Sequence, residues 1–442
     1  MQNFHPNRHC TRIRGAGGSV GLGGDATRRG TAGAGMKNDF MRLGLPVAPS
    51  LGLSAGQISI PPTILRLALI VAKFFGLFQI ARYMTRDGLR IICYHGVAVA
   101  EEYKYRSRLF IRKELFRRRI EYLRRKRYPI LPLGEAVEAL ELDRLPPCAT
   151  VVTMDDGWEG VYSVALPIIK ELGIPVTLYV PTFYIEHPMP VFSVTLAYLF
   201  WRTKARRVDL PRGLGTFALD SQAEQAEASA QELGASLPAA DRLRFLREMA
   251  EALGVSFEDI ETQRLFRALD EQQLRQLADA GVDIQLHSHR HEWPLDDREK
   301  VESEIAENRA FLERLVSHPL EHFCYPSGAY ALPDGRLLFA SELNQGEWLA
   351  ALGVKSATTI EPGLNYPDTP RFALRRLMDG HPVSDIEFEA EMTGFMEIVR
   401  ALRERRFFRM LRRRLRSYSD HSGSSLQDSK DEQGTRDSAR NS

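Results

Sequence analysis

The stretch Val151-Val152-Thr153-Met154-Asp155-Asp156-Gly157 is a short apolar run that stops at two adjacent carboxylates and a glycine. An apolar run of this length is typical of a strand that is buried on both faces, as in a parallel sheet. In α/β barrels the residues that follow such strands gather at one mouth, where catalytic groups lie. Asp-Asp-Gly also forms ordinary turns, because Asp caps the turn and Gly supplies positive φ. This stretch alone therefore leaves a turn and a functional site as alternatives.

A second stretch, Leu286-His287-Ser288-His289-Arg290-His291, continues the apolar positions Val282 and Ile284. It presents His287 and His291 four residues apart, after another predicted strand. Two imidazoles and one carboxylate are a common ligand set for Zn²⁺ or a similar divalent ion, and they leave positions for water and substrate. A neighbouring carboxylate can accept the proton of that water. A histidine cluster without metal is the alternative, but the two stretches together favour a metal-dependent hydrolase.

Apolar runs and helical patterns alternate along the middle of the chain, and this rhythm predicts a parallel α/β barrel over residues 87–395. We expect strands at residues 89–94, 128–131, 150–154, 176–180, 282–286, 322–325 and 354–358. We expect helices at residues 112–127, 133–142, 164–172, 299–316 and 336–352. A largely helical insertion at about residues 183–270 separates the two stretches quoted above. Its aromatic first part is suited to a lid or glycan-binding wall, and a packed helical appendage is the alternative.

The two motifs resemble those of the polysaccharide deacetylases, the NodB-homology or carbohydrate esterase 4 family. Residues 153–157 are similar to the family's Thr-Phe-Asp-Asp-Gly motif, with Met154 in place of Phe. Residues 287–291 are similar to its His-Ser/Thr-x-x-His motif, and residues 323–328 add a further likeness. The resemblance runs from about Leu89 to about Thr393. It implies that the predicted barrel is a distorted (β/α)₇ barrel.

The stretch Ile91-Ile92-Cys93-Tyr94-His95-Gly96-Val97 suggests a subgroup of this family. It resembles the Tyr-His stretch that opens the poly-N-acetylglucosamine deacetylases, whose motif order is circularly permuted so that the catalytic-acid histidine comes first. No Leu-x-His-Asp motif follows His291 to supply that histidine, which agrees with a permuted order. The alternative for His95 is a histidine at a strand end that bonds only to backbone.

The resemblance also implies roles for individual residues. Asp156, His287 and His291 would hold the metal, for which Zn²⁺ is the leading candidate. Asp155 would be the general base, and His95 the acid that protonates the leaving amine.

Further residues are expected on the substrate and oxyanion side of the site. Ser288 would also fix the histidine pair, Tyr325 would face the substrate, and the backbone N–H of Ser327 would face the oxyanion. His289 has no role in the family and is interpreted as a wall residue.

The sequence departs from the family at its third motif. Many members begin that motif with an arginine that orients the base, and Cys324 stands at this position here. Arg376 is a candidate substitute for that arginine. The later Asp-x-x-Asp-Trp motif of the family is not found in the sequence.

The composition bounds the class of protein. The 442 residues are 44% hydrophobic and 26% charged, which is typical of a globular chain, and the net charge of +2 argues against a nucleic-acid binder. The four cysteines are scattered and read as reduced rather than as a disulfide framework.

The two ends of the chain differ from the middle. Residues 1–56 and 417–442 lack apolar periodicity and are predicted to be disordered, and the first segment does not show the pattern of a signal peptide. Residues 61–86 form a predicted amphipathic basic helix and residues 396–416 a second basic helix. Charges interrupt both, so neither is expected to span a bilayer. The first helix is suited either to the surface of a membrane or to packing on the barrel. The second is suited either to an anionic membrane or to solvent. A cytoplasmic or membrane-peripheral location is favoured.

Taken together, these features predict a metal-dependent hydrolase that removes N-acetyl groups from a polysaccharide or a lipid-linked saccharide. Its expected partner is an N-acetylated glycan. Two alternatives stay open: a carbohydrate-binding relative with weakened catalysis, and an amidohydrolase that acts on a non-sugar N-acyl substrate.

Overall fold

A computed structural model of the chain describes residues 61–294, 297–326, 329–331, 337–339 and 345–403. The predicted disordered segments at residues 1–56 and 417–442 lie outside the described residues. So does the part of the predicted basic helix beyond residue 403.

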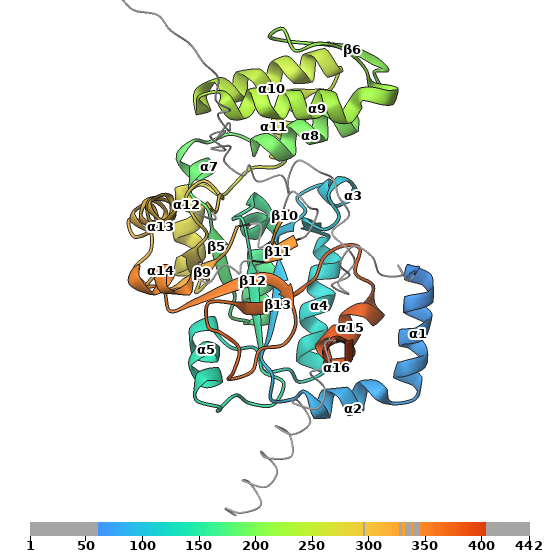
Figure 1. Cartoon of the computed structure of the whole chain (residues 1–442), viewed down its shortest axis with the longest axis vertical. Coiled ribbons are helices and arrows are strands. Elements are labelled where there is room, and N and C mark those ends of the chain that lie inside the picture. The colour runs from blue at the N-terminus through green and yellow to red at the C-terminus, as the bar shows by residue number, and fades with distance from the viewer. Residues whose placement is uncertain (1–60, 295–296, 327–328, 332–336, 340–344, 404–442) are drawn as a thin grey trace, which may run out of the picture. The chain divides into compact units, whose positions relative to one another are not determined.

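The centre of the structure is a closed barrel of parallel strands (Figure 1). Around the barrel the order is β1-β13-β12-β9-β8-β5-β4, so each strand pairs with its neighbours along the chain and the last strand closes on the first. The strands are β1 (Arg90–Tyr94), β4 (Thr150–Met154), β5 (Thr177–Val180), β8 (Asp283–Leu286), β9 (His322–Cys324), β12 (Ser356–Pro362) and β13 (Leu374–Met378). The predicted seven-stranded α/β barrel is confirmed.

The helices around this barrel bury its outer face. They are α4 (Lys113–Arg125), α5 (Leu133–Glu141), the π-helix η1 (Val161–Ala165), α6 (Leu166–Leu172), α12 (Glu271–Asp279), α13 (Arg298–Leu312) and α14 (Gly346–Ala351). Every residue of β1 and β4 is buried, because one face of each strand meets these helices and the other fills the barrel. The very basic α4 still packs on the barrel, since Phe116, Ile120 and Leu123 form its buried stripe.

The seventh strand is not the one expected from the sequence. Residues 128–131 were predicted as a strand, but they contribute only an isolated bridge between Ile130 and Thr150. The barrel is closed instead by β13, whose sequence Leu-Arg-Arg-Leu-Met does not read as an apolar run. Arg376 of this strand is fully buried. A search for apolar runs misses this strand, because a charged residue can be buried where its charge is paired, as Arg376 is with Asp155.

The predicted helix at residues 336–352 is largely wrong. Among the described residues of this range, helix is confined to α14, and β11 (Leu337–Phe339) pairs in antiparallel fashion with β10 (Ala329–Ala331). A short apolar run is compatible with either structure, and here pairing with a neighbouring segment decides. Another two-stranded sheet joins β2 (Gly96–Val97) to β3 (Phe110–Ile111), next to the short helix α3 (Glu102–Tyr105).

The insertion between β5 and β8 is largely helical, as predicted. It comprises α7 (Phe183–Glu186), α8 (Phe192–Arg202), the hairpin β6 (Arg207–Leu210) and β7 (Gly215–Ala218), α9 (Leu219–Ser236), α10 (Ala239–Leu253) and α11 (Phe257–Thr262). Its hydrophobic core around Phe245, Leu246 and Met249 also takes in Phe110 and Trp158, which lie outside the insertion. Isolated bridges from Trp158 to Ala268 and from Pro190 to Arg267 tie its ends together beside the barrel.

The predicted single helix at residues 61–86 is two helices, α1 (Pro62–Phe74) and α2 (Leu77–Met84), bent by 80°. Gly76 lies between them with a φ of 76°, a left-handed conformation that ends a helix and that glycine adopts without steric cost. The two helices form an elbow around α15 (Asp385–Met392) and α16 (Phe395–Arg403) (Figure 1).

The C-terminal basic helix begins as α16, and one of its predicted exposed cations is buried. Arg400 is 5% exposed, and its guanidinium donates two hydrogen bonds to Glu391 at 3.0 and 2.9 Å. Arg400 therefore ties α16 to α15 and is not available to a membrane.

One close backbone approach provides a test of the packing on which the site rests. Gly160 has helical φ and ψ of −65° and −12°, so helix propensity favours alanine there. A Cβ at Gly160 would lie 1.7 Å from the carbonyl oxygen of Val97. We expect Gly160→Ala to lower the free energy of unfolding by about 3 kcal/mol in urea denaturation, because backbone must move.

Gly173→Ala is the matched control. No atom lies within 4 Å of its Cβ position, and only its φ of 58° opposes alanine, which costs about 1 kcal/mol. Equal losses in the two variants would contradict the described contact between β2 and the turn before η1.

Candidate metal and catalytic site

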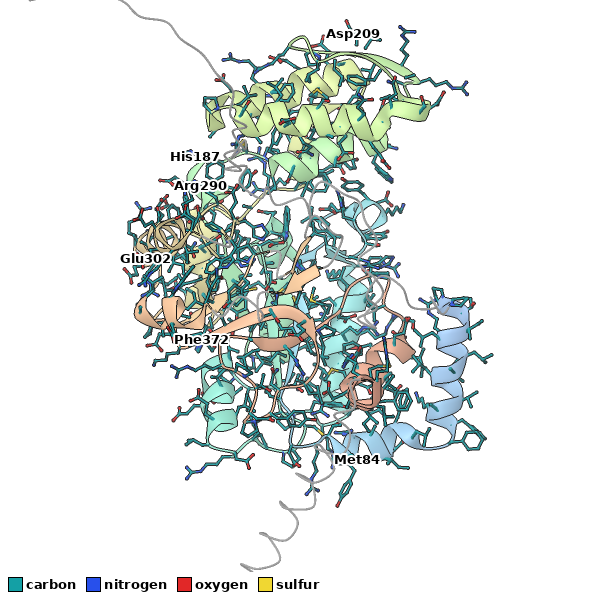
Figure 2. All side chains as sticks on the ribbon, in the orientation of Figure 1. Met84, His187, Asp209, Arg290, Glu302 and Phe372 are labelled. Carbon is teal, nitrogen blue, oxygen red and sulfur yellow. The ribbon has the colours of Figure 1, made fainter. Side chains whose placement is uncertain are left out.

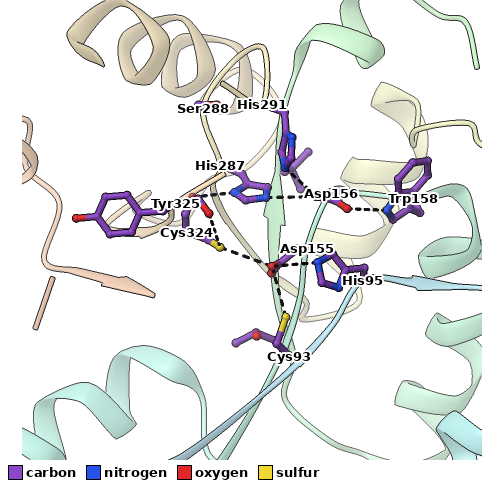
Figure 3. A network of polar contacts seen from close by, with 12 residues as sticks. Cys93, His95, Asp155, Asp156, Trp158, His287, Ser288, His291, Cys324 and Tyr325 are labelled. Atoms are coloured by element: carbon purple, nitrogen blue, oxygen red, sulfur yellow. Dashed lines mark hydrogen bonds and ion pairs between the residues drawn. The ribbon is translucent and has the colours of Figure 1, made fainter. Parts of the chain in front are cut away.

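The predicted site residues meet at the carboxyl ends of three barrel strands (Figure 3). His95 follows β1, Asp155 and Asp156 follow β4, and the loop after β8 carries His287 and His291. Parallel strands bring these ends to one mouth of the barrel, although the residues are far apart in sequence.

Asp156 and the two histidines form a compact ligand set. One carboxylate oxygen of Asp156 lies 3.4 Å from Nε2 of His287 and 3.2 Å from Nε2 of His291. One ligand atom from each residue lies within 4.8 Å of the other two. Two imidazole nitrogens and a carboxylate oxygen converging in this way fit a divalent ion with open coordination positions.

Neighbouring groups fix the orientation of these ligands. Nδ1 of His287 lies 2.7 Å from the carbonyl oxygen of Cys324, which can only accept, so Nδ1 carries the proton and Nε2 offers a lone pair. The second oxygen of Asp156 accepts a hydrogen bond of 2.9 Å from the indole N–H of Trp158. The backbone N–H of His287 donates to the side chain of Asn308 at 3.0 Å. Such outer contacts are what a metal site requires to stay in shape.

The loops that carry the ligands adopt uncommon backbone conformations. Asp156, Ser288 and His291 have φ values of 71°, 60° and 58°, in the left-handed region that L-residues rarely occupy. Residues are held in this region where the surrounding structure over-determines them, which is frequent at functional sites.

Asp155 lies beside the ligand set and is held by an arginine. Nη1 and Nη2 of Arg376 donate to its two oxygens at 2.7 and 2.8 Å, and both side chains are buried. Burial alone raises the pKa of Asp155, but the charge and hydrogen bonds of Arg376 outweigh it and bring the pKa below its ordinary value. Asp155 is therefore a carboxylate at neutral pH.

Two thiols also face Asp155. Sγ of Cys93 and Sγ of Cys324 lie 3.5 and 3.6 Å from the same carboxylate oxygen. Burial raises the pKa of both thiols well above the ordinary value, so they are protonated and donate weakly to Asp155. The described cysteines are free, in agreement with the prediction that cysteines of this chain are reduced.

His95 is adjacent to the same carboxylate. Its Nε2 lies 4.0 Å from an oxygen of Asp155, and its side chain is 17% exposed. Its Nδ1 is buried and has no hydrogen-bond partner among the described residues. His95 therefore reaches the pocket from the neighbouring strand end, as the predicted acid must.

For Asp156, burial favours the protonated form, yet the contacts with His287 and His291 hold the pKa of this carboxyl well below its ordinary value. Asp156 and Asp155 are thus both carboxylates, and their partners differ. Asp156 faces imidazoles that can share a cation, whereas Asp155 faces a guanidinium and two thiols.

Comparison with known proteins agrees with this geometry. The family model described as "Polysaccharide deacetylase" matches residues 144–333. Residues 144–333 are therefore similar to the polysaccharide deacetylase family. The matched segment contains both carboxylates and both histidines of the ligand set, whereas His95 and Arg376 lie outside it. The circularly permuted motif order stays a prediction.

No curated protein matches the sequence, but solved structures are similar. The Streptococcus pyogenes deacetylase PplD in complex with acetate is 17% identical, with a TM-score of 0.44 over 69% of this chain and 98% of that chain. IcaB from Ammonifex degensii is 19% identical, with a TM-score of 0.43 over 70% of this chain and 97% of that chain. The BpsB deacetylase domain from Bordetella bronchiseptica is 16% identical, with a TM-score of 0.38 over 65% and 94%.

Of the residues predicted on the substrate side of the site, Tyr325 and Ser288 have hydrogen-bond partners within the fold, and their contact with substrate stays a prediction. The hydroxyl of Tyr325 donates to the carbonyl of Phe372 at 3.1 Å, and its N–H donates to the carbonyl of Thr358 at 3.2 Å. Both donors are thus used within the fold. Ser288 is fully buried, and its hydroxyl accepts from the N–H of Glu292, which agrees with the prediction that it fixes the histidine loop.

Two other predictions have different outcomes. Ser327 lies outside the described residues, so its part in the oxyanion site stays a prediction. His289, interpreted as a wall residue, is buried and its Nδ1 lies 2.8 Å from the hydroxyl of Thr182. It joins the histidine loop to the start of the insertion.

The sequence reading missed the supporting residues Trp158, Asn308 and Cys93. Trp158 follows Asp156 by two positions and Cys93 precedes His95 by two, so proximity in sequence was a usable signal for both. Asn308 comes from α13, and nothing in its local sequence distinguishes it from a surface residue of that helix.

The ion pair between Arg376 and Asp155 leads to a prediction about stability. Arg376→Met leaves a buried carboxylate without its partner, and we expect it to lower the free energy of unfolding by about 3–5 kcal/mol. Arg375→Met on the same strand is the control, because Arg375 is 23% exposed and lies 3.6 Å from Glu361. We expect this control to lose less than about 1 kcal/mol in the same urea denaturation. Similar losses in both variants would show that the buried pair is not special.

Proposed function

We propose that this protein is a metal-dependent hydrolase that removes N-acetyl groups from a polysaccharide or a lipid-linked saccharide. The observation that carries the proposal is the convergence of Asp156, His287 and His291 on one point, with the buried pair of Asp155 and Arg376 beside it. A ligand set and an ionised carboxylate in contact with it are the parts that metal-assisted amide hydrolysis requires.

Asp156, His287 and His291 would hold the metal. Zn²⁺ suits nitrogen and oxygen donors of this kind and number. When bound, a divalent ion supplies Lewis-acid polarisation of the acyl group and activation of water.

Asp155 is proposed as the general base. A base must be ionised before the reaction, and the lowered pKa of Asp155 provides this at neutral pH. Arg376 binds both oxygens in a bidentate manner, which orients the carboxylate and leaves lone pairs for the proton of the attacking water. Arg376 is a positioning residue in this scheme.

His95 is proposed as the general acid. An amine leaves poorly as an anion, so a proton must reach its nitrogen as the C–N bond breaks. An imidazole is suited to this step, because its ordinary pKa of about 6.5 lets it carry a proton near neutral pH. The distance of 4.0 Å between His95 and Asp155 supports the assignment, since base and acid must reach the same acyl group.

A carbohydrate-binding relative with weakened catalysis is the main alternative. It rests on Cys324, which stands where many polysaccharide deacetylases have the arginine that orients the base. Arg376 makes the contact with the base from another strand, and this supports an active enzyme. A non-sugar N-acyl substrate is the other alternative, and the choice rests on substrate tests.

The proposed function predicts acetate release and metal content together. Purified protein should contain about one divalent ion per chain and should release acetate from at least one N-acetylated glycan in a panel that also holds non-sugar N-acyl compounds. Asp155→Asn should keep the ion by elemental analysis yet lose most acetate release, and His287→Ala should lose the ion. Release from non-sugar compounds alone would contradict the proposed substrate class, and full activity of Asp155→Asn would contradict the mechanism.

The role of His95 predicts a difference between two kinds of substrate. We expect His95→Ala to lose roughly 10²–10⁴-fold in amide hydrolysis, because its amine leaves only when protonated. An activated acetyl ester has a leaving group that departs without a proton, so its hydrolysis should change far less. Equal losses on the two substrates, or a loss of metal in His95→Ala, would assign His95 to binding or to the ligand set instead.

A further inference from the structure

The outer face of α1 and α2 exposes many large apolar side chains. In the described part of the chain, most exposed large apolar residues lie here: Ile64, Leu67, Ile70, Val71, Phe74, Phe75, Leu77, Ile80 and Tyr83. Phe74 and Phe75 are 83% and 70% exposed at the bend between the helices. Side chains along both helices, as far as Met84, project away from the rest of the molecule (Figure 2). We call this surface the apolar elbow.

The inner face of these helices is apolar as well. Leu69, Ala72 and Phe78 are buried against Ala390 of α15 and Met396 of α16. A helix with apolar residues on two opposite faces is stabilised when both faces meet an apolar environment. Among the described residues, that environment is present only at the inner face.

The charges of α1 are used within the protein. Its charged residues are Arg66 and Lys73, and each forms an ion pair with a glutamate of α15, Glu387 and Glu389 respectively. These pairs hold α1 in a fixed orientation on α15. They also leave the outer face of α1 without a charged group.

Among the described residues, no single helix is long and apolar enough to cross a membrane, although α1 and α2 together pass that test as a pair bent by 80°. Both members of the pair dock on α15 and α16 through their inner faces. This arrangement is suited to helices that lie along a surface.

A group of cations borders the apolar elbow at the end of α4. Arg124, Arg125, Lys126 and Arg127 are all exposed, and none of the four forms an ion pair with another described residue. Arg82 of α2 donates a hydrogen bond of 2.7 Å to the carbonyl of Lys126, so this segment lies directly against α2. We call residues 124–127 the cationic turn.

We propose that the apolar elbow and the cationic turn together bind the surface of an anionic phospholipid bilayer. Exposed apolar side chains enter the boundary between headgroups and acyl chains, and unpaired cations attract anionic headgroups. A second copy of the chain fits this surface less well, because a two-fold contact through the elbow would bring two cationic turns into one interface. The proposal does not depend on the proposed hydrolase activity.

Flotation of the full-length protein with vesicles tests the proposal. We expect wild type to float with vesicles of phosphatidylcholine that contain about 30% phosphatidylserine, and to bind pure phosphatidylcholine more weakly. Phe74→Asp combined with Phe75→Asp should weaken binding on the order of tenfold or more, because two exposed rings that would enter the bilayer are replaced by charges. Leu142→Asp is the matched control, since Leu142 is 52% exposed but lies outside the elbow; it should bind as wild type does.

A second variant tests the cationic turn. Replacement of Arg124, Arg125, Lys126 and Arg127 by glutamine should remove most of the preference for anionic vesicles and most of the sensitivity to salt. Circular dichroism and thermal unfolding of each variant verify that it is folded, so a loss of binding cannot come from misfolding.

Three outcomes would overturn the proposal. One is that wild type binds neither kind of vesicle, and another is that the Phe74/Phe75 variant binds as well as wild type. The third is that wild type is a dimer without lipid and the Phe74/Phe75 variant a monomer, which would assign the elbow to contact between copies. Because flotation measures binding alone, these outcomes are separate from any failure to release acetate.

Discussion

The buried ion pair between Asp155 and Arg376 is the interaction on which the centre of this molecule depends. A buried guanidinium is tolerated only where its charge is paired and its donors are bonded, and Arg376 satisfies this with Asp155 and the carbonyl of Thr359. The two residues are 221 positions apart, so the pair also links the last strand of the barrel to the strand that bears the carboxylates. The pair therefore adds a side-chain link across the closed barrel and also keeps the proposed base ionised. The same pair gives the proposed base a cationic partner, although Cys324 stands where the resemblance leads one to expect an arginine.

The proposed metal ligands Asp156 and His287 are oriented by hydrogen bonds with residues of three different segments around the mouth of the barrel. The carbonyl of Cys324 selects the tautomer of His287, Asn308 bonds the backbone of the same histidine, and Trp158 binds the outer oxygen of Asp156. These groups belong to β9, to α13 and to the turn after β4. Each has an ordinary structural reason to be where it is, and together they hold two strained loops in position. The geometry of the site is consequently a property of the closed barrel rather than of either motif.

The periphery divides into two parts with different physical needs. The insertion buries its apolar side chains in a core that it shares with Ala98, Phe110 and Trp158 from the loops after β1 and β4. The apolar elbow does not satisfy its side chains in this way. Its inner face covers α15 and α16, which are tied to the base of the barrel by Arg90 through the carbonyl of Met392. Its outer face is exposed among the described residues. The adjacent cations favour an anionic surface as its binding partner.

The sequence by itself determined the class of fold, the two motifs and the residues able to hold a metal, because strand period, apolar runs and side-chain chemistry are local properties. It also identified Arg376 as a candidate partner of the base, although it could not recognise β13, since two arginines hide the strand pattern. Only the tertiary structure decided which strand closes the barrel and that Arg400 is buried. It also decided that the hydroxyl and the N–H of Tyr325 donate to carbonyls within the fold, and that the helix predicted at residues 61–86 bends at Gly76. These outcomes depend on which groups meet after the chain closes on itself. Pairing of a buried charge or donor is a property of two distant segments, and no local pattern contains it.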